Sequence, residues 1–257
     1  MLKSVLKQEK QNQSKSNLAA LDEYGRYYEQ SRGGHTVKLE NFPKYVSREA
    51  ITRFLARQEI FLKQLNVCGS IVELGVGRGG SLMSWAQLSS IYEPANYTRK
   101  IIGFDTFGGF PQIDKMDRAG VKVSEQLRPG GLAVEEGMKE DIEKAVQLWD
   151  MTRYLNHIAK VTLIKGNILK TLPAYVEENP HLVVSLLHLD ADLYEPTKLG
   201  LELLLPRMPK GAVLLFDELN MEIFPGETIA VLEAVGIVNL KIERMTYAPN
   251  ISYAVIE

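Results

Sequence analysis

Six acidic side chains stand at or just beyond the ends of short apolar segments. They are Glu73, Asp105, Asp190, Asp192, Asp217 and Glu218. Short apolar segments rich in β-branched residues are typical of buried parallel strands. In an open α/β sheet, ligands bind in the crevice at the carboxyl ends of such strands. The spacing therefore predicts that these carboxylates gather at one edge of a sheet, where they can bind a ligand.

Three of these residues, Asp190, Asp217 and Glu218, follow the fourth and fifth expected strands, which are expected to be neighbours. Carboxylates that converge in a partly buried site repel one another unless a positive charge lies between them. Mg²⁺ prefers oxygen ligands and usually keeps several waters. We expect these three side chains to bind Mg²⁺. The alternative is helix capping, by Asp192 and by Asp217, because aspartate is a favoured N-cap residue.

A metal site of this kind can activate a hydroxyl group. A substrate hydroxyl could replace one metal-bound water, and the metal would then lower the pKa of that hydroxyl. A carboxylate beside it could accept the proton while the alkoxide attacks a methyl group. Asp190 is the residue that we predict to be this base. His188 lies two residues earlier, faces the same side of the strand and is predicted to be a core histidine.

A glycine-rich turn follows the first expected strand, Ile71–Leu74. It contains Gly75, Gly77, Gly79 and Gly80. Such a turn lets the backbone adopt positive φ and approach a ligand closely. Glu73 would repel a phosphate but not a cationic or amine-bearing ligand. The dinucleotide pattern Gly-x-Gly-x-x-Gly is also matched, and a purely structural turn remains the other interpretation. At the end of the next strand, Asp105 could accept hydrogen bonds from both hydroxyls of a ribose.

The elements that must position these residues alternate along the chain. Strands are expected at 71–74, 100–104, 161–165, 181–189, 212–216, 240–244 and 252–256, and helices lie between most of them. The pattern predicts an α/β fold with a doubly wound, mostly parallel, seven-stranded sheet that ends in a β pair. A helix is expected from the N-cap Ser47, with its apolar face formed by Ile51, Phe54, Leu55, Leu62 and Leu65.

Composition limits the classes of partner. The chain of 257 residues has a formal net charge of −2, which offers no general attraction to nucleic acid or to an anionic membrane. Its single cysteine, Cys68, excludes an internal disulfide and is expected to be a small buried residue. No signal peptide and no run of about 18 apolar residues is visible. We therefore expect a cytoplasmic protein.

Five separated stretches resemble one family. They begin at Glu73, Gly103, Gly166, Leu189 and Phe216, and the Leu-Asp-x-Asp-Leu-Tyr segment at 189–194 is the most specific. In order, they resemble motifs of the macrocin, mycinamicin and novobiocin sugar O-methyltransferases. The resemblance implies a Rossmann-like class I methyltransferase that uses S-adenosylmethionine and Mg²⁺ to methylate a deoxysugar hydroxyl. It also implies a homo-oligomer with a small-molecule substrate.

Carried over position by position, the resemblance assigns roles to individual residues. Cofactor contacts are implied at Glu73, Gly75, Gly77, Ser81, Asp105, Thr106, Asn167, Ile168 and Asp190. Metal ligands are implied at Asp190, Asp217 and Glu218, with Asp190 also the base. The family usually has a second aspartate where Glu218 stands, and residues 220–227 do not match its well-known members. The acceptor sugar, and whether it is a nucleotide sugar or a finished glycoside, therefore stays open.

We divide the chain into an N-terminal tail and helical extension at 1–66 and a cofactor-binding domain at 67–257. An insertion at about 107–156 is expected to form a lid, a surface excursion or an oligomer contact. Three alternatives to sugar methylation remain. They are a catechol-type or other small-molecule O-methyltransferase, an NAD-dependent sugar oxidoreductase and a non-catalytic binding module.

Overall fold

The structure is a computed structural model that describes residues 15–257. The first part of the tail predicted at the N-terminus, residues 1–14, lies outside this range. The chain divides into two compact units, one ending at Leu55 and one running from Ala56 to Glu257. Among the described residues, no helix combines the length and the apolar character that crossing a membrane requires.

The first unit consists of short helical segments. They are α2 (Lys15–Gln30), α3 (His35–Glu40), the 3₁₀ helix η1 (Phe42–Lys44) and the start of α4 (Arg48–Gln64). The ring of Tyr45 packs against Tyr27 and Tyr28, with centroids 5.5 and 5.4 Å away. Ser47 caps α4 as predicted, because its Oγ accepts a hydrogen bond from the backbone N–H of Ala50 (3.2 Å).

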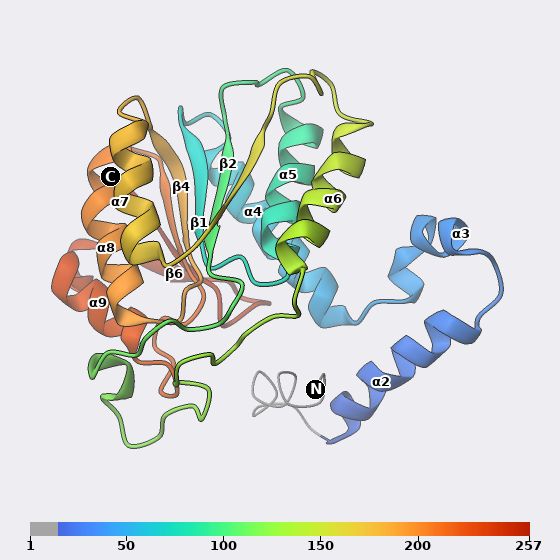
Figure 1. The fold of residues 1–257 in the computed structure, drawn as a ribbon, viewed down its shortest axis with the longest axis horizontal. Coiled ribbons are helices and arrows are strands. Elements are labelled where there is room, and N and C mark those ends of the chain that lie inside the picture. Colours follow the sequence, from blue (N-terminus) through green and yellow to red (C-terminus); the bar gives the residue numbers. More distant parts are fainter. Residues whose placement is uncertain (1–14) are drawn as a thin grey trace. The chain divides into compact units, whose positions relative to one another are not determined.

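The second unit is built on one seven-stranded sheet (Figure 1). In chain order its strands are β1 (Ser70–Leu74), β2 (Ile101–Asp105), β3 (Val161–Lys165), β4 (Val184–Leu189), β5 (Val213–Phe216), β6 (Ile242–Arg244) and β7 (Ser252–Val255). Their order in the sheet is β3-β2-β1-β4-β5-β7-β6. The first five strands pair in parallel, and β7 pairs antiparallel with both β5 and β6. The predicted doubly wound, mostly parallel fold is therefore confirmed.

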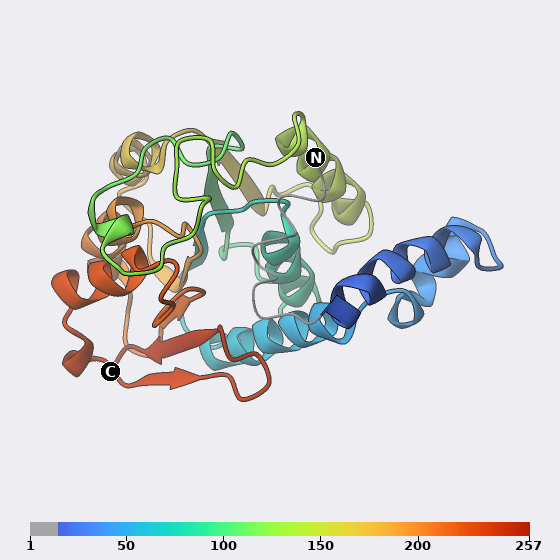
Figure 2. The ribbon, with the colours of Figure 1, turned by 90° about the horizontal axis from the view of Figure 1, so that it is seen from below.

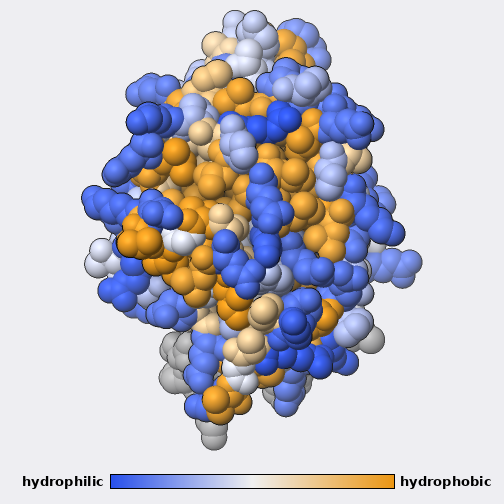
Figure 3. Space-filling view, turned by 90° about the vertical axis from the view of Figure 1, so that its left-hand side faces the viewer, coloured by the Kyte–Doolittle hydropathy of each residue, from blue (hydrophilic) through white to orange (hydrophobic). Residues whose placement is uncertain are grey.

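Helices cover both faces of this sheet (Figures 1 and 2). They are α5 (Gly80–Tyr92), α6 (Met138–Asp150), α7 (Ile168–Glu178), α8 (Tyr194–Leu204) and α9 (Gly226–Ala234), with short 3₁₀ helices η2 (Met116–Arg118), η3 (Leu205–Arg207) and η4 (Ile237–Asn239). Alternate strand residues enter two separate cores. On β1, Ile71 packs with α4, α5 and α6, whereas Val72 and Leu74 pack with α7, α8 and α9. The side of the second unit that carries α7–α9 shows a mixture of polar and apolar surface (Figure 3). On α9, the apolar side chain of Leu232 is exposed.

Three local predictions were wrong. In the second unit, α4 buries Ala56, Ile60 and Phe61, whereas Leu62, expected on the apolar face, is 42% exposed. The buried residues are spaced for one helical face, and the longer apolar pattern chosen from the sequence followed a different face. Cys68 is exposed in the loop before β1. β4 begins at Val184 rather than at residue 181, because the N–H of Leu182 is already bonded in a turn to the carbonyl of Asn179 (3.0 Å).

A buried arginine joins the elements at the amino ends of the central strands. Arg99 is 3% exposed and forms an ion pair with Glu93 (2.8 Å). Its guanidinium donates to the carbonyl oxygens of Leu65, Val67 and Gly69 at 3.0 Å each, and also to Gln64 and Ser185. The planar fork of arginine suits such simultaneous contacts. One side chain therefore fixes the end of α4, the loop before β1 and the start of β4.

We expect Arg99→Met to lower the free energy of unfolding by about 3–5 kcal/mol, because it leaves Glu93 as an unpaired buried charge. Urea denaturation followed by circular dichroism measures this loss. The exposed Arg128→Met variant is the control and should change stability by no more than about 0.5 kcal/mol. A loss below about 1 kcal/mol for Arg99→Met, within the range of a surface ion pair, would contradict the role assigned here.

Candidate active site

Parallel pairing brings the three predicted metal ligands together. β4 lies between β1 and β5, so the carboxyl ends of these strands meet. The N–H of Asp190 donates to the carbonyl of Leu74 (2.9 Å), and the N–H of Asp217 donates to the carbonyl of Leu189 (3.3 Å). One carboxylate oxygen from each of Asp190, Asp217 and Glu218 lies within 4.8 Å of the others. This acidic pocket has the oxygen donors that Mg²⁺ prefers.

The electrostatics of the acidic pocket favour a bound cation. Loss of hydration raises the pKa of Asp190 well above its usual value, and the charges of Asp217, Asp192 and Glu73 raise it further. For Glu218 the loss of hydration is again the largest cause of a raised pKa, followed by the charges of Asp192 and Asp217. The Oε2 atom of Glu218 is buried without a hydrogen-bond partner in the structure. A cation would satisfy this oxygen and stabilise the ionised carboxylates.

A histidine connects the acidic pocket with the first strand. His188 is opposite Glu73 in the pairing of β4 with β1, and its side chain is 2% exposed. Its Nδ1 lies 3.5 Å from Oε2 of Glu73, and its Nε2 lies 3.8 Å from Oδ2 of Asp190. The ring of Trp85 meets the imidazole edge-on, at 5.9 Å between centroids. His188 is therefore a core residue that faces Asp190, as predicted.

Glu73, which the resemblance places at the cofactor, lies in the interior of the second unit. Its side chain is 0% exposed. Oε1 accepts a hydrogen bond from Oγ of Ser81 (2.5 Å), and Oε2 accepts one from Nε1 of Trp85 (2.9 Å). Both partners lie on α5, so Glu73 and Ser81 attach the first helix to β1 beneath the glycine turn. These two hydrogen bonds hold the glycine turn against α5. A contact of Glu73 or Ser81 with the cofactor stays a prediction.

Two glycines in the turn have different functions. Gly75 has φ +94°, and a Cβ there would lie 1.8 Å from the carbonyl oxygen of Asp190. Only glycine lets the end of β1 pass so close to the end of β4. Gly77 has φ +54°, and a Cβ there would meet nothing within 4 Å. The first glycine therefore permits the acidic pocket to form, and the second leaves open space along the backbone for a ligand.

Asp105 holds the same turn from the end of β2. Its Oδ2 accepts the N–H groups of Val76 and Gly77, both at 2.8 Å, and its Oδ1 accepts the N–H of Phe107 (2.6 Å). A carboxylate has about four acceptor positions, so three hydrogen bonds leave one for a ribose hydroxyl. Phe107, with φ +54°, adopts the left-handed conformation beside it. Strained residues of this kind cluster at ligand sites.

The remaining predicted cofactor residues have local structural partners. The Oδ1 of Asn167 accepts the N–H of Leu169 (3.0 Å) and caps α7. Ile168, the next residue, is 8% exposed in the core beside β2. Thr106 donates its hydroxyl to the carbonyl of Gly109 (2.6 Å) and shapes the loop after β2. These contacts fix the loop after β2 and the start of α7.

The segment after β2 packs across the carboxyl edge of the sheet, beside α8 and α9 (Figures 1 and 2). Asp117 accepts the N–H of Tyr194, the first residue of α8, through Oδ1 (2.6 Å). The N–H of Ser124 donates to the carbonyl of Ile223 (3.0 Å). An apolar cluster joins the two sides and contains Phe110, Leu127, Leu193 and Phe224. The insertion therefore covers the loops that carry the acidic pocket.

A second contact fastens the insertion to the glycine turn. Arg78, between Gly77 and Gly79, donates through Nε and Nη2 to the two carboxylate oxygens of Glu135, both at 3.0 Å. Each side chain is 46% exposed, and the hydrogen bonds to Arg78 lower the pKa of Glu135. This paired geometry is the strong form of an arginine–carboxylate contact.

Sequence reasoning missed three groups at this edge: the Arg78–Glu135 pair, Asp117 and Glu227. Their partners lie 57, 77 and 9 residues away along the chain. No residue spacing or periodicity marks a contact across such distances. Glu227, which accepts the N–H of Glu218, would be interpreted from sequence as an ordinary charge in the first turn of a helix.

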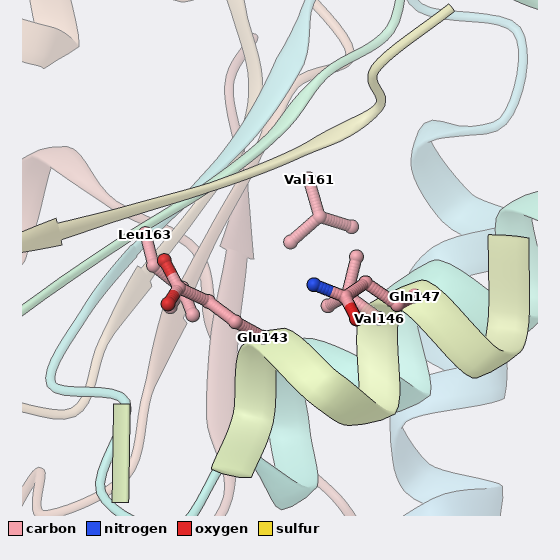
Figure 4. Close-up of a pocket in the computed structure, with 5 residues that line it drawn as sticks. All are labelled: Glu143, Val146, Gln147, Val161 and Leu163. Carbon is pink, nitrogen blue, oxygen red and sulfur yellow. The ribbon is translucent and has the colours of Figure 1, made fainter. Parts of the chain in front are cut away.

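A shallow pocket of about 360 Å³ lies elsewhere, between α6 and β3 (Figure 4). Its lining residues are Glu143, Val146, Gln147, Val161 and Leu163. None of them is a predicted site residue, and a single carboxylate offers no acid–base pair. The acidic pocket is the better candidate for catalysis because its groups converge and their pKa values are perturbed.

Comparisons with known proteins agree on one family. Residues 45–232 match the sequence profile of the macrocin O-methyltransferase (TylF) family. The chain is 30% identical over 157 residues to the 8-demethyl-8-(2,3-dimethoxy-α-L-rhamnosyl)-tetracenomycin-C 4′-O-methyltransferase of Streptomyces olivaceus, which is 59% of this chain and 53% of that protein. It is 28% identical to the demethyldecarbamoylnovobiocin O-methyltransferase of Streptomyces niveus, over 61% of this chain and 55% of that protein. The matches thus span about half the length of these curated relatives.

Solved structures extend the likeness to most of the chain. A crystal structure of the calicheamicin methyltransferase CalS11 superposes with a TM-score of 0.90 at 31% identity, covering 94% of this chain and 93% of that one. A second structure, of the apo protein and titled a TDP-rhamnose 3′-O-methyltransferase, gives 0.81 at 29% identity, covering 94% and 95%. Since the family profile matches well over half of the sequence, this chain belongs to the macrocin O-methyltransferase (TylF) family.

Proposed function

We propose that this protein transfers a methyl group from S-adenosylmethionine to a hydroxyl of a deoxysugar, with Mg²⁺ held by Asp190, Asp217 and Glu218. The observation that carries the proposal is the acidic pocket, whose three carboxylates lie beside the glycine turn with an oxygen each within 4.8 Å. Family membership supports methyl transfer. The printed names of two relatives, which specify a rhamnosyl group and TDP-rhamnose, support a deoxysugar acceptor.

The residues present fit both bound groups. Gly77 leaves room along the turn, and Asp105 keeps one acceptor position, so the end of β2 can hold the adenosine part of the cofactor. The buried, unpartnered Oε2 of Glu218 fits a hard cation. Glu218 is one methylene longer than the aspartate usual at this position, and it still reaches the shared space with Asp190 and Asp217.

When bound, S-adenosylmethionine supplies an electrophilic methyl group and Mg²⁺ lowers the pKa of the sugar hydroxyl. Asp190 would accept the hydroxyl proton, because its backbone N–H pairs with the last carbonyl of β1 and so places it beside the glycine turn. Asp217 and Glu218 would hold the ion beside Asp190. The insertion, fastened by Asp117 and by the Arg78–Glu135 pair, would exclude water.

The oligomeric state and the cytoplasmic location stay predictions. The small-molecule sugar partner follows from the same relatives and is part of the proposal. The acceptor can be a nucleotide sugar or a finished glycoside, and the assay below compares the two.

We expect Asp190→Asn to lower turnover by at least about 10²-fold, because it removes the proton acceptor and one metal ligand. Release of S-adenosylhomocysteine measures turnover, and calorimetry with S-adenosylhomocysteine checks that cofactor binding persists. Glu222→Gln removes an exposed acid from the neighbouring loop and serves as control. Turnover near the wild-type value in Asp190→Asn would rule out the assigned base.

The choice of acceptor is tested by assaying the protein with three compounds separately: TDP-rhamnose, a rhamnosylated aromatic glycoside and a catechol. Each assay is run once with Mg²⁺ and once with a chelator. We expect product only from a deoxysugar acceptor and only when Mg²⁺ is present. Mass spectrometry of the product locates the methyl group. Methylation of the catechol alone would assign the protein to catechol-type substrates, and chelator-resistant methylation would contradict the role of Mg²⁺.

The effect of Mg²⁺ on stability should increase with pH. Asp190 and Glu218 have raised pKa values in the folded chain. Without metal, the folded state therefore binds more protons than the unfolded state above about pH 4. The stability of the metal-free protein then falls as the pH rises through the pKa values of the folded state. Mg²⁺ competes with these protons. Thermal melts should therefore show a larger Mg²⁺-induced increase in Tm at pH 8 than at pH 6. An equal increase at both values would be inconsistent with ligation by these carboxylates.

A further inference from the structure

A fourth carboxylate lies against the acidic pocket and has no role in the mechanism above. Glu227 is in the first turn of α9 and is 0% exposed. Its Oε1 accepts the backbone N–H of Glu218 at 3.2 Å. Its Oε2 is buried and has no hydrogen-bond partner, like the Oε2 of Glu218. Two orphaned carboxylate oxygens therefore lie on adjoining elements of one buried region.

The position of Glu227 is fixed by the start of its helix. A Cβ on the preceding residue, Gly226, would lie 2.2 Å from Oδ1 of Asp117 and 2.7 Å from the backbone nitrogen of Tyr194. Only glycine lets α9 begin this close to the insertion and to α8. The start of α9 is thus packed against Asp117 and Tyr194, so Glu227 cannot reach solvent unless α9 moves.

The first turn of α9 holds the loop after β5 with two consecutive side chains. Besides the contact from Glu227 to Glu218, the hydroxyl oxygen of Thr228 accepts the N–H of Asn220 (2.9 Å). Asn220 has φ +65°, so the loop is held in a conformation that needs support. A neutral oxygen is sufficient for such a contact, as Thr228 shows. The negative charge of Glu227 therefore requires a different explanation.

The surroundings of Glu227 make its charge costly unless a cation is present. Its side chain is fully buried, and the buried carboxyl group of Glu218 belongs to the residue whose N–H it accepts. An unpaired buried charge destabilises a fold, whereas a buried neutral amide would make the same backbone contact without that cost. Glu227 is not among the residues whose oxygens lie within 4.8 Å of one another, so it is placed outside the set of direct ligands.

We propose that Glu227 is a positioning residue for the Mg²⁺ site, in which one oxygen fixes the backbone of Glu218 and the other accepts a hydrogen bond from a water of the bound ion. The inference rests on the proposed Mg²⁺ site and adds an outer carboxylate to it. Outer partners of this kind orient the direct ligands and commonly change metal affinity by about 10–100-fold when they are replaced.

The test is calorimetric titration of the full chain with Mg²⁺ in the absence of substrate. Glu227→Gln keeps the size and the acceptor for the N–H of Glu218 but removes the charge, and we expect its Kd for Mg²⁺ to rise by about 10–100-fold. Thr228→Val removes the neighbouring loop contact and should leave Kd within about twofold. Glu233→Gln makes the same charge change at an exposed position of α9, and it should also leave the Kd for Mg²⁺ within about twofold.

A second readout separates an ion-dependent role from a merely structural one. Without Mg²⁺, Glu227→Gln should melt at the same temperature as the wild type or higher, because a buried negative charge is gone. With Mg²⁺ it should lose most of the wild-type increase in Tm. Electron paramagnetic resonance with Mn²⁺ as probe should show a weaker site with a changed water environment.

The outcomes are distinguishable. No Mg²⁺ binding by the wild type would overturn the proposed function itself. Wild-type binding with an unchanged Kd in Glu227→Gln would leave that function standing and overturn this inference. An equal loss of affinity in Thr228→Val would also overturn it, because loop order rather than the carboxylate would then control the site.

Discussion

The mutual repulsion of carboxylates held at neighbouring strand ends is the constraint on which this structure depends. Asp190 and Asp217 cannot separate, because each donates its backbone N–H to the last carbonyl of the adjoining strand. Parallel pairing of β1, β4 and β5 thus imposes an electrostatic cost that the folded chain cannot relieve by local movement. A divalent cation bound between these carboxylates would relieve this cost, and this is the physical basis of the proposed Mg²⁺ site.

The acidic residues at this edge fall into two groups with different chemistry. Glu73 and Asp105, on the side of the glycine turn, have both oxygens occupied by hydrogen bonds from the protein. Their charge is satisfied, and they shape the backbone that a cofactor would meet. Glu218 and Glu227 each keep a buried oxygen without a partner. Glu73 and Asp105 thus shape the glycine turn, with one acceptor position left on Asp105, whereas Glu218 and Glu227 each leave a whole buried oxygen available.

Distant segments close around the acidic pocket. Asp117 supplies the acceptor for the first N–H of α8, and the apolar contact of Phe110 with Phe224 joins the insertion to the loop after β5. The parallel strands provide a rigid support, and the loops at their carboxyl edge carry the acidic residues.

The sequence by itself determined the class of fold. It also determined that Asp190, Asp217 and Glu218 meet at the carboxyl edge of the sheet. Alternation of apolar segments with amphipathic ones dictates a parallel sheet, and a residue that directly follows a parallel strand must lie at its carboxyl edge. Only the tertiary structure decided that Glu73 faces inward to Ser81 and Trp85, that Asp117 caps α8 and that Glu227 stands behind Glu218. These contacts depend on how helices and loops pack against the sheet, and packing joins residues whose separation along the chain has no period that a sequence pattern could reveal.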